Sequence, residues 1–333
     1  MQKLLKTLLV VFTLIVCIFT TGCFDSLGGF DISCRQEPDY EDGYYDGDEW
    51  EDDGWAETLS ITGNCEYVYI LENNVHDNTN IGIDFYGNAG YCSTPSLDQP
   101  RYSVASGNYI SNSQCGYADC AGLYVDGARD IILQYNTITR SNFGIEIGSE
   151  EKQESYPVKI IIVRNNLIYD NLKVGIRVGG YEEVETGVVQ DTLFANNTLI
   201  NNGEEIVIAK VNGIQFVNNI IKAKQGEVVI KTDFSTSYCK NITFTNNYIS
   251  VANTSTSQYK FEMFNSTQTG ITAFQNKTGA TVITGNLTLD SKYIPSADSV
   301  VINAGASTNY GNYDYLLRPR LNGAVDIGAL ERH

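Results

Sequence analysis

Residues 161–178 read IIVRNNLIYDNLKVGIRV, and this stretch contains the pattern that repeats along the chain. A short apolar run, Ile161-Ile162-Val163, precedes Asn166, a second run follows it, and a third run opens with Gly175-Ile176. The apolar residues do not recur at helical spacing, and short runs of this kind are typical of strands. Three short strands separated by polar turns predict one coil of a parallel β-helix.

The same pattern recurs along the chain, marked each time by an Asn before a short apolar segment. Consecutive Asn residues of this set are 22 to 39 positions apart, a period typical of units that bury their apolar faces only against neighbours. Leucine-rich repeats and propeller blades have other patterns, which are absent here. Asn tolerates left-handed corners and can hydrogen-bond along a stack. We therefore interpret eight residues as structural: Asn74, Asn108, Asn136, Asn166, Asn197, Asn219, Asn247 and Asn286.

The repeat divides the chain into parts. We expect an all-β helix of roughly eight to nine coils over residues 58–292. Residues 293–333 lose the repeat and contain Pro295 and Pro319, so they predict a non-repetitive tail that packs on the last coils.

The N-terminus has the features of an export signal. Residues 1–22 carry two Lys and then an apolar run that is too short to span a membrane comfortably. The small residues that end this segment abut Cys23, and the segment resembles a bacterial lipoprotein signal. We expect lipidation of Cys23, a lipid anchor as the only attachment to a membrane, and a place in the cell envelope, with ordinary secretion as the alternative.

The next segment, residues 23–57, is predicted to be a disordered acidic tether, because residues 37–53 hold ten acidic residues and no basic one. The full chain has 22 basic and 40 acidic residues. Such a balance makes nucleic acid an improbable partner.

Export also bears on the cysteines, because an oxidising compartment permits disulfides. Three of them lie around one long insertion between coils, and we expect Cys92 to pair with Cys115 or Cys120.

Four third strands can be aligned on their Gly-Ile or Gly-Leu openings, at residues 82–87, 122–127, 144–149 and 175–180. Alternation directs Ile83, Phe85 and their equivalents inward. One outward column then reads Asp84, Tyr124, Glu146, Arg177, and a second reads Tyr86, Asp126, Gly148, Gly179. The two Gly predict a shallow trough, and residues just past the strands are expected to form its rim: Asn88, Arg129, Glu150 and Tyr181. Later coils place Val207 where the first column continues.

These segments, together with Val325-Asp326-Ile327-Gly328 after Arg318-Pro319-Arg320, resemble the right-handed parallel β-helix proteins of the pectate-lyase-like superfamily. The resemblance covers residues 58–331. It implies a right-handed parallel β-helix, an extended polysaccharide as partner, and cleavage of that polymer. We expect a monomer.

For a lyase-like β-elimination on a uronate-containing glycan, the resemblance implies the following roles. Asp126, Glu146 and Glu150 would hold calcium, Arg177 or Arg129 would meet the uronate, and Arg177 or Tyr124 would be the base. Tyr86, Asn88 and Tyr181 would contact the sugar. We take this reaction as the leading hypothesis.

Two alternatives remain open. An inverting glycoside hydrolase would use Asp84 or Asp126 with Glu146, and Asp84 and Glu146 lie two coils apart, roughly 9 to 10 Å. A glycan-binding or adhesion protein without catalysis is the third possibility, because only about one coil, from Leu59, precedes the segment at Gly82.

Overall fold

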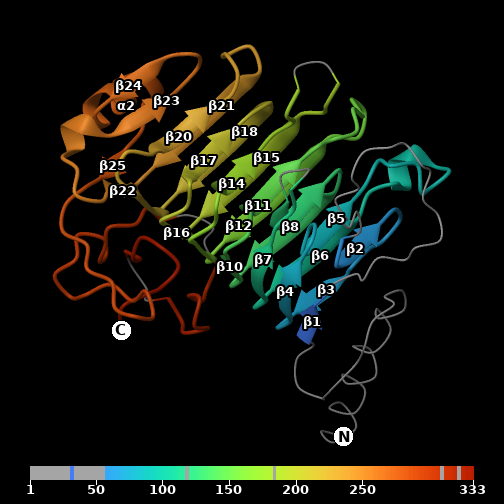
Figure 1. Cartoon of the computed structure of the whole chain (residues 1–333), viewed down its shortest axis with the longest axis horizontal. Helices are drawn as coiled ribbons and strands as arrows, with labels where there is room; N and C mark the ends of the chain where they lie inside the picture. The colour runs from blue at the N-terminus through green and yellow to red at the C-terminus, as the bar shows by residue number, and fades with distance from the viewer. Residues whose placement is uncertain (1–30, 34–56, 117–119, 183–184, 308–310, 321–323) are drawn as a thin grey trace, which may run out of the picture.

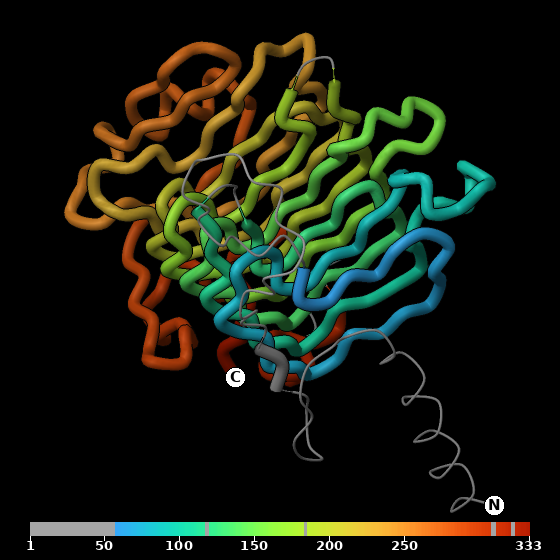
Figure 2. Tube along the Cα trace, turned by 45° about the vertical axis from the view of Figure 1, so that its right-hand side comes forward, coloured from blue at the N-terminus to red at the C-terminus, as the bar shows by residue number. Residues whose placement is uncertain are grey.

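The computed structural model describes residues 31–33, 57–116, 120–182, 185–307, 311–320 and 324–333. The signal segment, Cys23 and most of the acidic tether lie outside these residues. The chain winds through three sheets in turn, one strand of each per coil, and Figure 2 follows the coils in order from blue to orange. The sheets are defined below by their strands.

Sheet A contains β1 (Asp31–Ser33), β4 (Asn74–Asn78), β7 (Tyr109–Ser113), β10 (Thr137–Thr139), β13 (Leu167–Tyr169), β16 (Thr198–Ile200), β19 (Ile220–Ala223), β22 (Asn247–Val251) and β25 (Val282–Ile283). Sheet B contains β2 (Leu59–Thr62), β5 (Ile83–Tyr86), β8 (Ala121–Asp126), β11 (Phe143–Gly148), β14 (Val174–Val178), β17 (Glu204–Ile208), β20 (Val228–Thr232), β23 (Lys260–Glu262) and β24 (Thr267–Thr269). Sheet C contains β3 (Tyr69–Leu71), β6 (Arg101–Ser106), β9 (Arg129–Gln134), β12 (Val158–Arg164), β15 (Val189–Ala195), β18 (Val211–Val217) and β21 (Cys239–Thr245).

Strands of successive coils pair in parallel throughout the three sheets, as in β8, β11 and β14. The pair β23–β24 is antiparallel and closes one end of sheet B. Three short helices interrupt the coils, η1 (Pro95–Leu97), η2 (Thr256–Gln258) and α2 (Ile271–Thr278). The prediction of a right-handed parallel β-helix is confirmed (Figure 1).

The core fills the interior of the coils. The residues predicted to point inward from sheet B are buried, at 0 or 1% exposure: Ile83, Phe85, Leu123, Val125, Ile145, Ile147, Ile176 and Val178. In sheet C, the rings of Phe194 and Phe216 stack at 4.7 Å, and those of Phe216 and Phe244 at 5.1 Å. Burial of each such side chain contributes about 1.5 to 3 kcal/mol, so the stack of coils supplies its own core.

An Asn ladder runs inside the corner before sheet A. Each Asn side-chain oxygen accepts hydrogen bonds from the backbone N–H and the Nδ2 of the Asn one coil earlier, at 2.8 to 3.1 Å. Its members are Asn73, Asn108, Asn136, Asn166, Asn197, Asn219 and Asn247. Two assignments were wrong. The first member is Asn73, because Asn74 pairs in register with Tyr109. Asn286 instead donates to Asp298, at 2.8 Å.

In the later coils, the Asn that precedes each ladder residue forms hydrogen bonds outside the ladder. Asn165, Asn196, Asn218 and Asn246 have left-handed backbones, with φ between 50 and 56°. Their side chains bond to the C-terminal tail, as in Asn196 Nδ2 to Asp326 O at 2.9 Å and Asn218 Nδ2 to Ala306 O at 2.9 Å. Within the tail, Arg320 forms a buried ion pair of 2.7 Å with Glu331. In each of these Asn-Asn pairs, the second Asn belongs to the ladder inside the coils, and the first Asn hydrogen-bonds to the tail.

A second ladder lies at the corner before sheet B and ends on a carboxyl group. Asn171 donates to Asn202 Oδ1, and Asn202 donates from its backbone and side chain to the two oxygens of Glu205, at 3.1 and 2.6 Å. Glu205 is 0% exposed. Burial raises the pKa of Glu205 to about 8, although the two hydrogen bonds from Asn202 act in the opposite direction.

This buried acid predicts a pH dependence of stability. The folded pKa exceeds the unfolded value of 4.5, so the stabilisation is complete below pH 4.5 and is lost as the pH rises toward about 8. The unfolding free energy should fall by roughly 2 kcal/mol between pH 5 and pH 7 from this group alone. Denaturant titrations of Glu205→Gln should show a flatter profile in this window. The exposed Glu227→Gln should keep the wild-type slope, and equal slopes for all three proteins would refute the assignment.

One boundary differs from the expectation. Residues 31–33, assigned to the disordered tether, form β1 and pair in parallel with β4. The strand adds to the N-terminal edge of sheet A, where unpaired backbone groups of β4 are available.

Candidate functional site

The predicted outward column exists on sheet B. Asp84 pairs in register with Tyr124, Tyr124 with Glu146, and Glu146 with Arg177. Val207 follows Arg177, as expected. Neighbouring positions are therefore one strand spacing apart, about 4.8 Å. The column places two carboxyls, a phenol and a guanidinium along one face of the solenoid.

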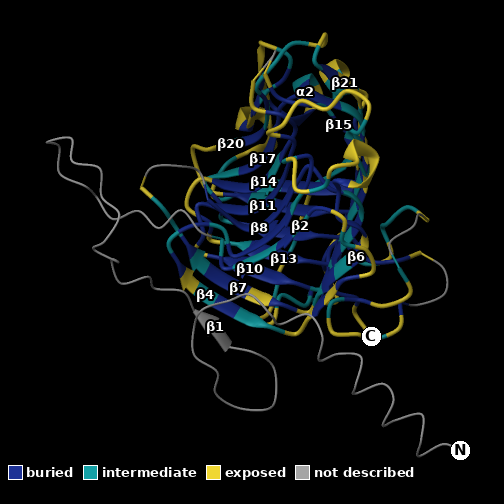
Figure 3. Cartoon of the chain, turned by 90° about the vertical axis from the view of Figure 1, so that its right-hand side faces the viewer, coloured by how far each residue is buried: buried dark blue, intermediate teal, exposed yellow. Residues whose placement is uncertain are grey.

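The first part of this column is covered. Asp84, Tyr124 and Glu146 are 2%, 4% and 8% exposed, and Figure 3 shows β8 and β11 as buried. The Arg177 side chain is more accessible, at 17%. Any ligand therefore meets the column first at Arg177.

The predicted trough at the two Gly is filled, and the reason is close packing. A Cβ on Gly148 would lie 2.9 Å from Cε2 of Tyr124, so the Tyr124 ring lies across Gly148. The Tyr124 hydroxyl reaches on to donate to Glu150 Oε1, at 3.2 Å. At Gly179 a Cβ would lie 2.6 Å from the backbone N of Lys210. Both positions need Gly because a neighbour occupies the space, and neither opens a trough.

Burial shifts three groups of this cluster toward their neutral forms. Burial raises the pKa of Asp84 well above its usual range, and the nearby Asp126 adds to the shift. Burial and the charge of Glu150 raise the pKa of Asp126, against one hydrogen bond from the Glu150 N–H at 2.9 Å. The pKa of Tyr124 is also raised, by burial first and by Asp126 second. These shifts favour the protonated form of each group.

Asp84 has an unused oxygen. Its Oδ1 is buried and has no hydrogen-bond partner among the residues that the structure describes. An unpaired buried polar atom costs about 1 to 3 kcal/mol, so such atoms call for an explanation. A ligand that bonds to Asp84 would remove this cost.

An ion chain extends the column toward the C-terminal coils. Arg177 lies 3.5 Å from Glu146 and 3.5 Å from Asp233, and Lys231 lies 3.4 Å from Asp233 and 3.8 Å from Glu204. Lys231 continues the column in register after Val207. The sequence reasoning missed Glu204, Lys231 and Asp233 because their strands do not open with Gly-Ile. The alternation in Val228–Thr232 is the signal that could have located Lys231.

The residues expected to contact the sugar divide into two groups. Tyr86, from the second column, and Tyr181, from the rim, lie near the acids. Burial and then Asp126 raise the pKa of Tyr86 to about 12, and burial and then Glu150 raise the pKa of Tyr181. Tyr181 and Glu150 are exposed.

Asn88 and Arg129 are engaged in other contacts. Asn88 is buried, and its Nδ2 donates to the carbonyl of Tyr156 at 3.1 Å. Arg129 begins β9 in sheet C, where its guanidinium pairs with Asp130 and lies 5.3 Å from the Tyr102 ring centre. Arg129 therefore faces away from the column of sheet B.

The calcium site on Asp126, Glu146 and Glu150 stays a prediction. Among the described residues no three His, Cys, Asp or Glu side chains converge as a set of metal ligands. Burial raises the pKa of Asp126, and Glu146 forms an ion pair with Arg177. No step proposed below uses calcium.

The expected disulfide is wrong. Cys115 bonds to Cys120, with their Cα atoms 6.1 Å apart, and Cys92 is a free thiol. Cys92 lies instead against Asp98, whose side chain accepts the Cys92 N–H at 2.9 Å.

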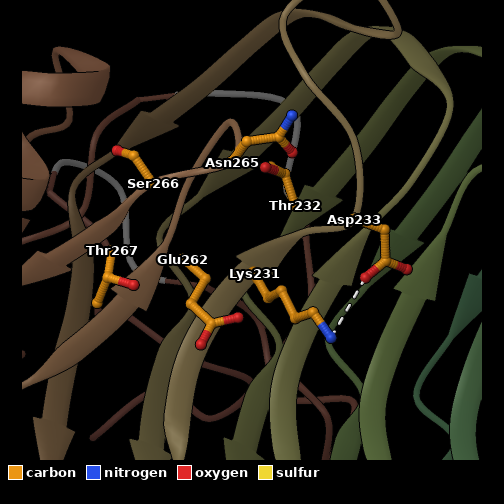
Figure 4. A pocket seen from close by; sticks show the side chains of 7 residues that line it. All are labelled: Lys231, Thr232, Asp233, Glu262, Asn265, Ser266 and Thr267. Carbon is orange, nitrogen blue, oxygen red and sulfur yellow. Dashed lines mark ion pairs between the residues drawn. The ribbon is translucent and has the colours of Figure 1, made fainter.

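Beyond the column lies a hollow of about 390 Å³ (Figure 4). One side is formed by Lys231, Thr232 and Asp233, at the end of β20. The other side is formed by Glu262 and by Asn265, Ser266 and Thr267, from the β23–β24 hairpin. The hollow therefore adjoins the ion chain directly.

Comparisons with known proteins give partial matches. No protein-family model matches the chain. The uncharacterised protein YwoF of Bacillus subtilis (strain 168) is 31% identical over 202 residues, which cover 55% of this chain and 41% of that protein. The chain therefore spans less than half the length of this relative.

Three of the solved structures that align with this chain are described here. Pectate lyase Pel9A is 13% identical over 83% of this chain and 68% of that chain, with a TM-score of 0.44. XylC in complex with xylose is 14% identical over 81% and 51%, with a TM-score of 0.42. The periplasmic alginate epimerase AlgG is 14% identical over 59% and 46%, with a TM-score of 0.37. Separately, no helix among the described residues has the length and apolarity needed to cross a membrane.

Proposed function

We propose that this protein is a cell-envelope glycoside hydrolase that acts on an extended, largely uncharged polysaccharide with inversion at the cleaved bond. The observation that carries the proposal is a pair of carboxyl groups in one column of sheet B whose environments differ. Burial raises the pKa of Asp84, and Glu146 forms an ion pair with Arg177. Two carboxyls with environments that separate their protonation states are the arrangement that acid–base catalysis needs.

The spacing of the two strands places the pair near the upper limit for inversion. Asp84 and Glu146 are two strand spacings apart, about 9.6 Å between backbones. Inverting pairs stand about 6.5 to 9.5 Å apart, which leaves room for a water molecule, whereas retaining pairs stand about 5 Å apart. Asp84 is preferred to Asp126 as the acid because its Oδ1 is free, while Asp126 accepts the Glu150 N–H.

The proton transfers follow from these states. Asp84 gives its proton to the glycosidic oxygen as the bond from that oxygen to the anomeric carbon breaks. Glu146 takes a proton from the water that attacks the same carbon from the opposite face. Arg177 positions Glu146 and keeps it ionised. A substrate enters from the Arg177 end and displaces the Tyr124 ring from Gly148.

An uncharged polymer suits the charges of this face. Along the column and the ion chain, Glu146, Glu204 and Asp233 outnumber Arg177 and Lys231. An extended solenoid face suits a polymer, and carboxylates accept hydrogen bonds from sugar hydroxyls. A polyanion would meet net repulsion.

The leading hypothesis from sequence, β-elimination, becomes the second candidate. Arg177 favours it, because a guanidinium can neutralise a uronate carboxylate. Its proposed bases do not suit the reaction. The raised pKa of Tyr124 keeps the phenol protonated, and Arg177 lies between two carboxylates.

The test is to incubate the purified protein with neutral and uronate polysaccharides and follow two products. New reducing ends on a neutral glycan, with the inverted anomer seen first by proton NMR, are the expected result. Ultraviolet absorbance from unsaturated sugars on a uronate polymer would identify a lyase. Binding without either product would leave only a glycan-binding protein.

A further inference from the structure

We propose that the outer face of sheet C carries a second, non-catalytic binding site for an uncharged polysaccharide chain. This site, called the strip below, has eight members: Tyr67, Tyr69, Tyr102, Val104, Ile132, Ile160, Ile162 and Leu193. The inference goes beyond the proposed hydrolysis, because the strip lies on a different sheet from Asp84 and Glu146. A polymer segment held there raises the effective concentration of the glycan at the carboxyl pair.

One outward column of sheet C is apolar in five successive coils. Its members pair in register from each coil to the next: Tyr69, Val104, Ile132, Ile162 and Leu193. The residues on either side of them fill the core, as Ile131 and Leu133 do around Ile132, so the column points outward. All five members are partly or fully exposed, and the next position is the polar Gln215. A continuous apolar surface of this kind marks a binding site, whereas single exposed apolar residues do not.

Two stacked tyrosines widen the strip at its N-terminal end. Tyr67 and Tyr102 are 61% and 43% exposed, and their ring centres lie 5.5 Å apart. The Arg129 guanidinium lies 5.3 Å from the Tyr102 ring centre and donates to the Tyr102 hydroxyl at 3.4 Å. Tyr102 is therefore held by contacts with the coil before it and the coil after it. Exposed rings that are fixed in this way offer an apolar surface and a polar hydroxyl at a low cost in conformational entropy.

Three side chains of the strip are attached to a strained backbone. Tyr67, Tyr102 and Ile160 have φ values of 57, 55 and 58°, in the left-handed region. At the same position, other coils hold residue types that tolerate this conformation: Asp130, Asp191, Gly213 and Asn241. The conformation is unfavourable for Tyr and more so for the β-branched Ile. Because all three side chains are exposed, core packing does not account for them, and strain of this kind clusters at functional sites.

The shape of the strip fits one extended polymer chain. Five coils span roughly 19 Å, and Tyr67 and Tyr69 are two residues apart, roughly 7 Å along the strand direction. A stable protein interface buries about 800 Å² on each partner, which is several times the area of the strip. The net charge of −18 also opposes the approach of a second copy of this chain. The long, narrow strip therefore suits a polymer better than a globular partner.

The borders of the strip suit a polymer without charge. They supply polar groups of both signs: Ser106, Arg129, Asp130, Gln134, Lys159 and Asp191. These groups can donate hydrogen bonds to sugar hydroxyls and accept hydrogen bonds from them. The charge of Arg129 is balanced by its ion pair with Asp130. The net charge of −18 on the whole chain opposes a polyanion.

The first experiment removes the two stacked rings. The variant is Tyr67→Ala with Tyr102→Ala, and the matched control is Tyr109→Ala, at an exposed tyrosine of sheet A. The probes are soluble chains of xylan, galactan, arabinan and polygalacturonate. Affinity is measured by calorimetry in the Asp84→Asn protein, so that cleavage does not consume the probe. Analytical ultracentrifugation gives the mass of each protein in solution.

We expect one neutral glycan to bind about tenfold more weakly to the double variant and with unchanged affinity to Tyr109→Ala. Equal affinities in the two proteins, no binding of any probe, or a preference for polygalacturonate that depends on Tyr67 and Tyr102 would overturn the proposal. A dimer that is lost in the double variant would assign this face to a second copy and also overturn it. Ring-dependent binding without new reducing ends from the unsubstituted protein would reject the proposed hydrolysis and retain the strip. New reducing ends with equal affinities would do the reverse.

The second experiment tests the strain with Ile160→Asn. Asn tolerates the left-handed backbone, so the variant should melt at a higher temperature than wild type while it binds the same neutral glycan several-fold more weakly. Thermal unfolding and calorimetry measure the two effects. A lower melting temperature together with unchanged affinity would assign Ile160 to folding and overturn its place in the strip.

Discussion

Asp84→Asn is expected to lower kcat by roughly 10²- to 10⁴-fold, the usual contribution of a general acid. Asn keeps the size of the side chain and cannot supply the proton. Asp84 is buried with a raised pKa and forms no ion pair among the described residues, so the folded variant should be at least as stable as wild type. The measurement is kcat on the most active neutral glycan, with thermal unfolding as the check on folding.

The matched control is Asp126→Asn, at a second buried aspartic acid with a raised pKa on the neighbouring strand. It should keep most of the activity, since Asp126 already accepts a hydrogen bond from the Glu150 N–H. In wild type, activity should decline as the pH rises through the raised pKa of Asp84. A larger loss of kcat in Asp126→Asn than in Asp84→Asn would show that Asp126 is the general acid and Asp84 is not.

Asn166→Ala is expected to destabilise the fold by about 4 kcal/mol, from removal of a fully buried, fully bonded side chain. Asn166 accepts two hydrogen bonds from Asn136 and donates to Asn197 Oδ1 and to the Leu133 carbonyl, all at 2.9 to 3.0 Å. Alanine leaves buried groups on two neighbouring coils without partners. The melting temperature should fall by roughly 10 °C, at 2 to 4 °C per kcal/mol for a domain of this size.

The control for this prediction is Asn276→Ala, at an exposed position of α2. It should change stability by less than about 0.5 kcal/mol, because alanine favours a helix and no buried bond is lost. Equal melting temperatures for the two variants would show that the ladder contributes no more to stability than an exposed Asn.

The register of sheet B could be predicted because alternation and the Gly-Ile openings are local signals. The same signals located the column from Asp84 to Arg177. Local signals gave the wrong residue where they were weak or ambiguous. In Asn73-Asn74 either residue could have been the ladder member, and the register against Tyr109 selects Asn73. In the last coil the register places Val282 opposite Asn247, so Asn286 lies four residues beyond the ladder position.

The surroundings of the column could not be predicted in the same way. The alternation of apolar and polar residues predicts that Tyr124 points outward, but it does not predict that the ring lies over Gly148. The ion chain joins Arg177 to Asp233 across 56 residues of sequence, and no local pattern relates them. The disulfide illustrates the same limit, since three cysteines of one insertion were equally compatible with several pairings.

By itself, the sequence determined the class of fold, the faces of the strands and the chemical types on each face, because these depend on periodicity and on neighbours within a coil. Only the tertiary structure decided which of those groups are buried, in which direction their pKa values shift and which of them form ion pairs. Burial and charge coupling are sums over atoms from several coils. They depend on how the coils stack, which is why the burial of Asp84, the ion chain of Arg177 and the hollow beside Lys231 became visible only in three dimensions.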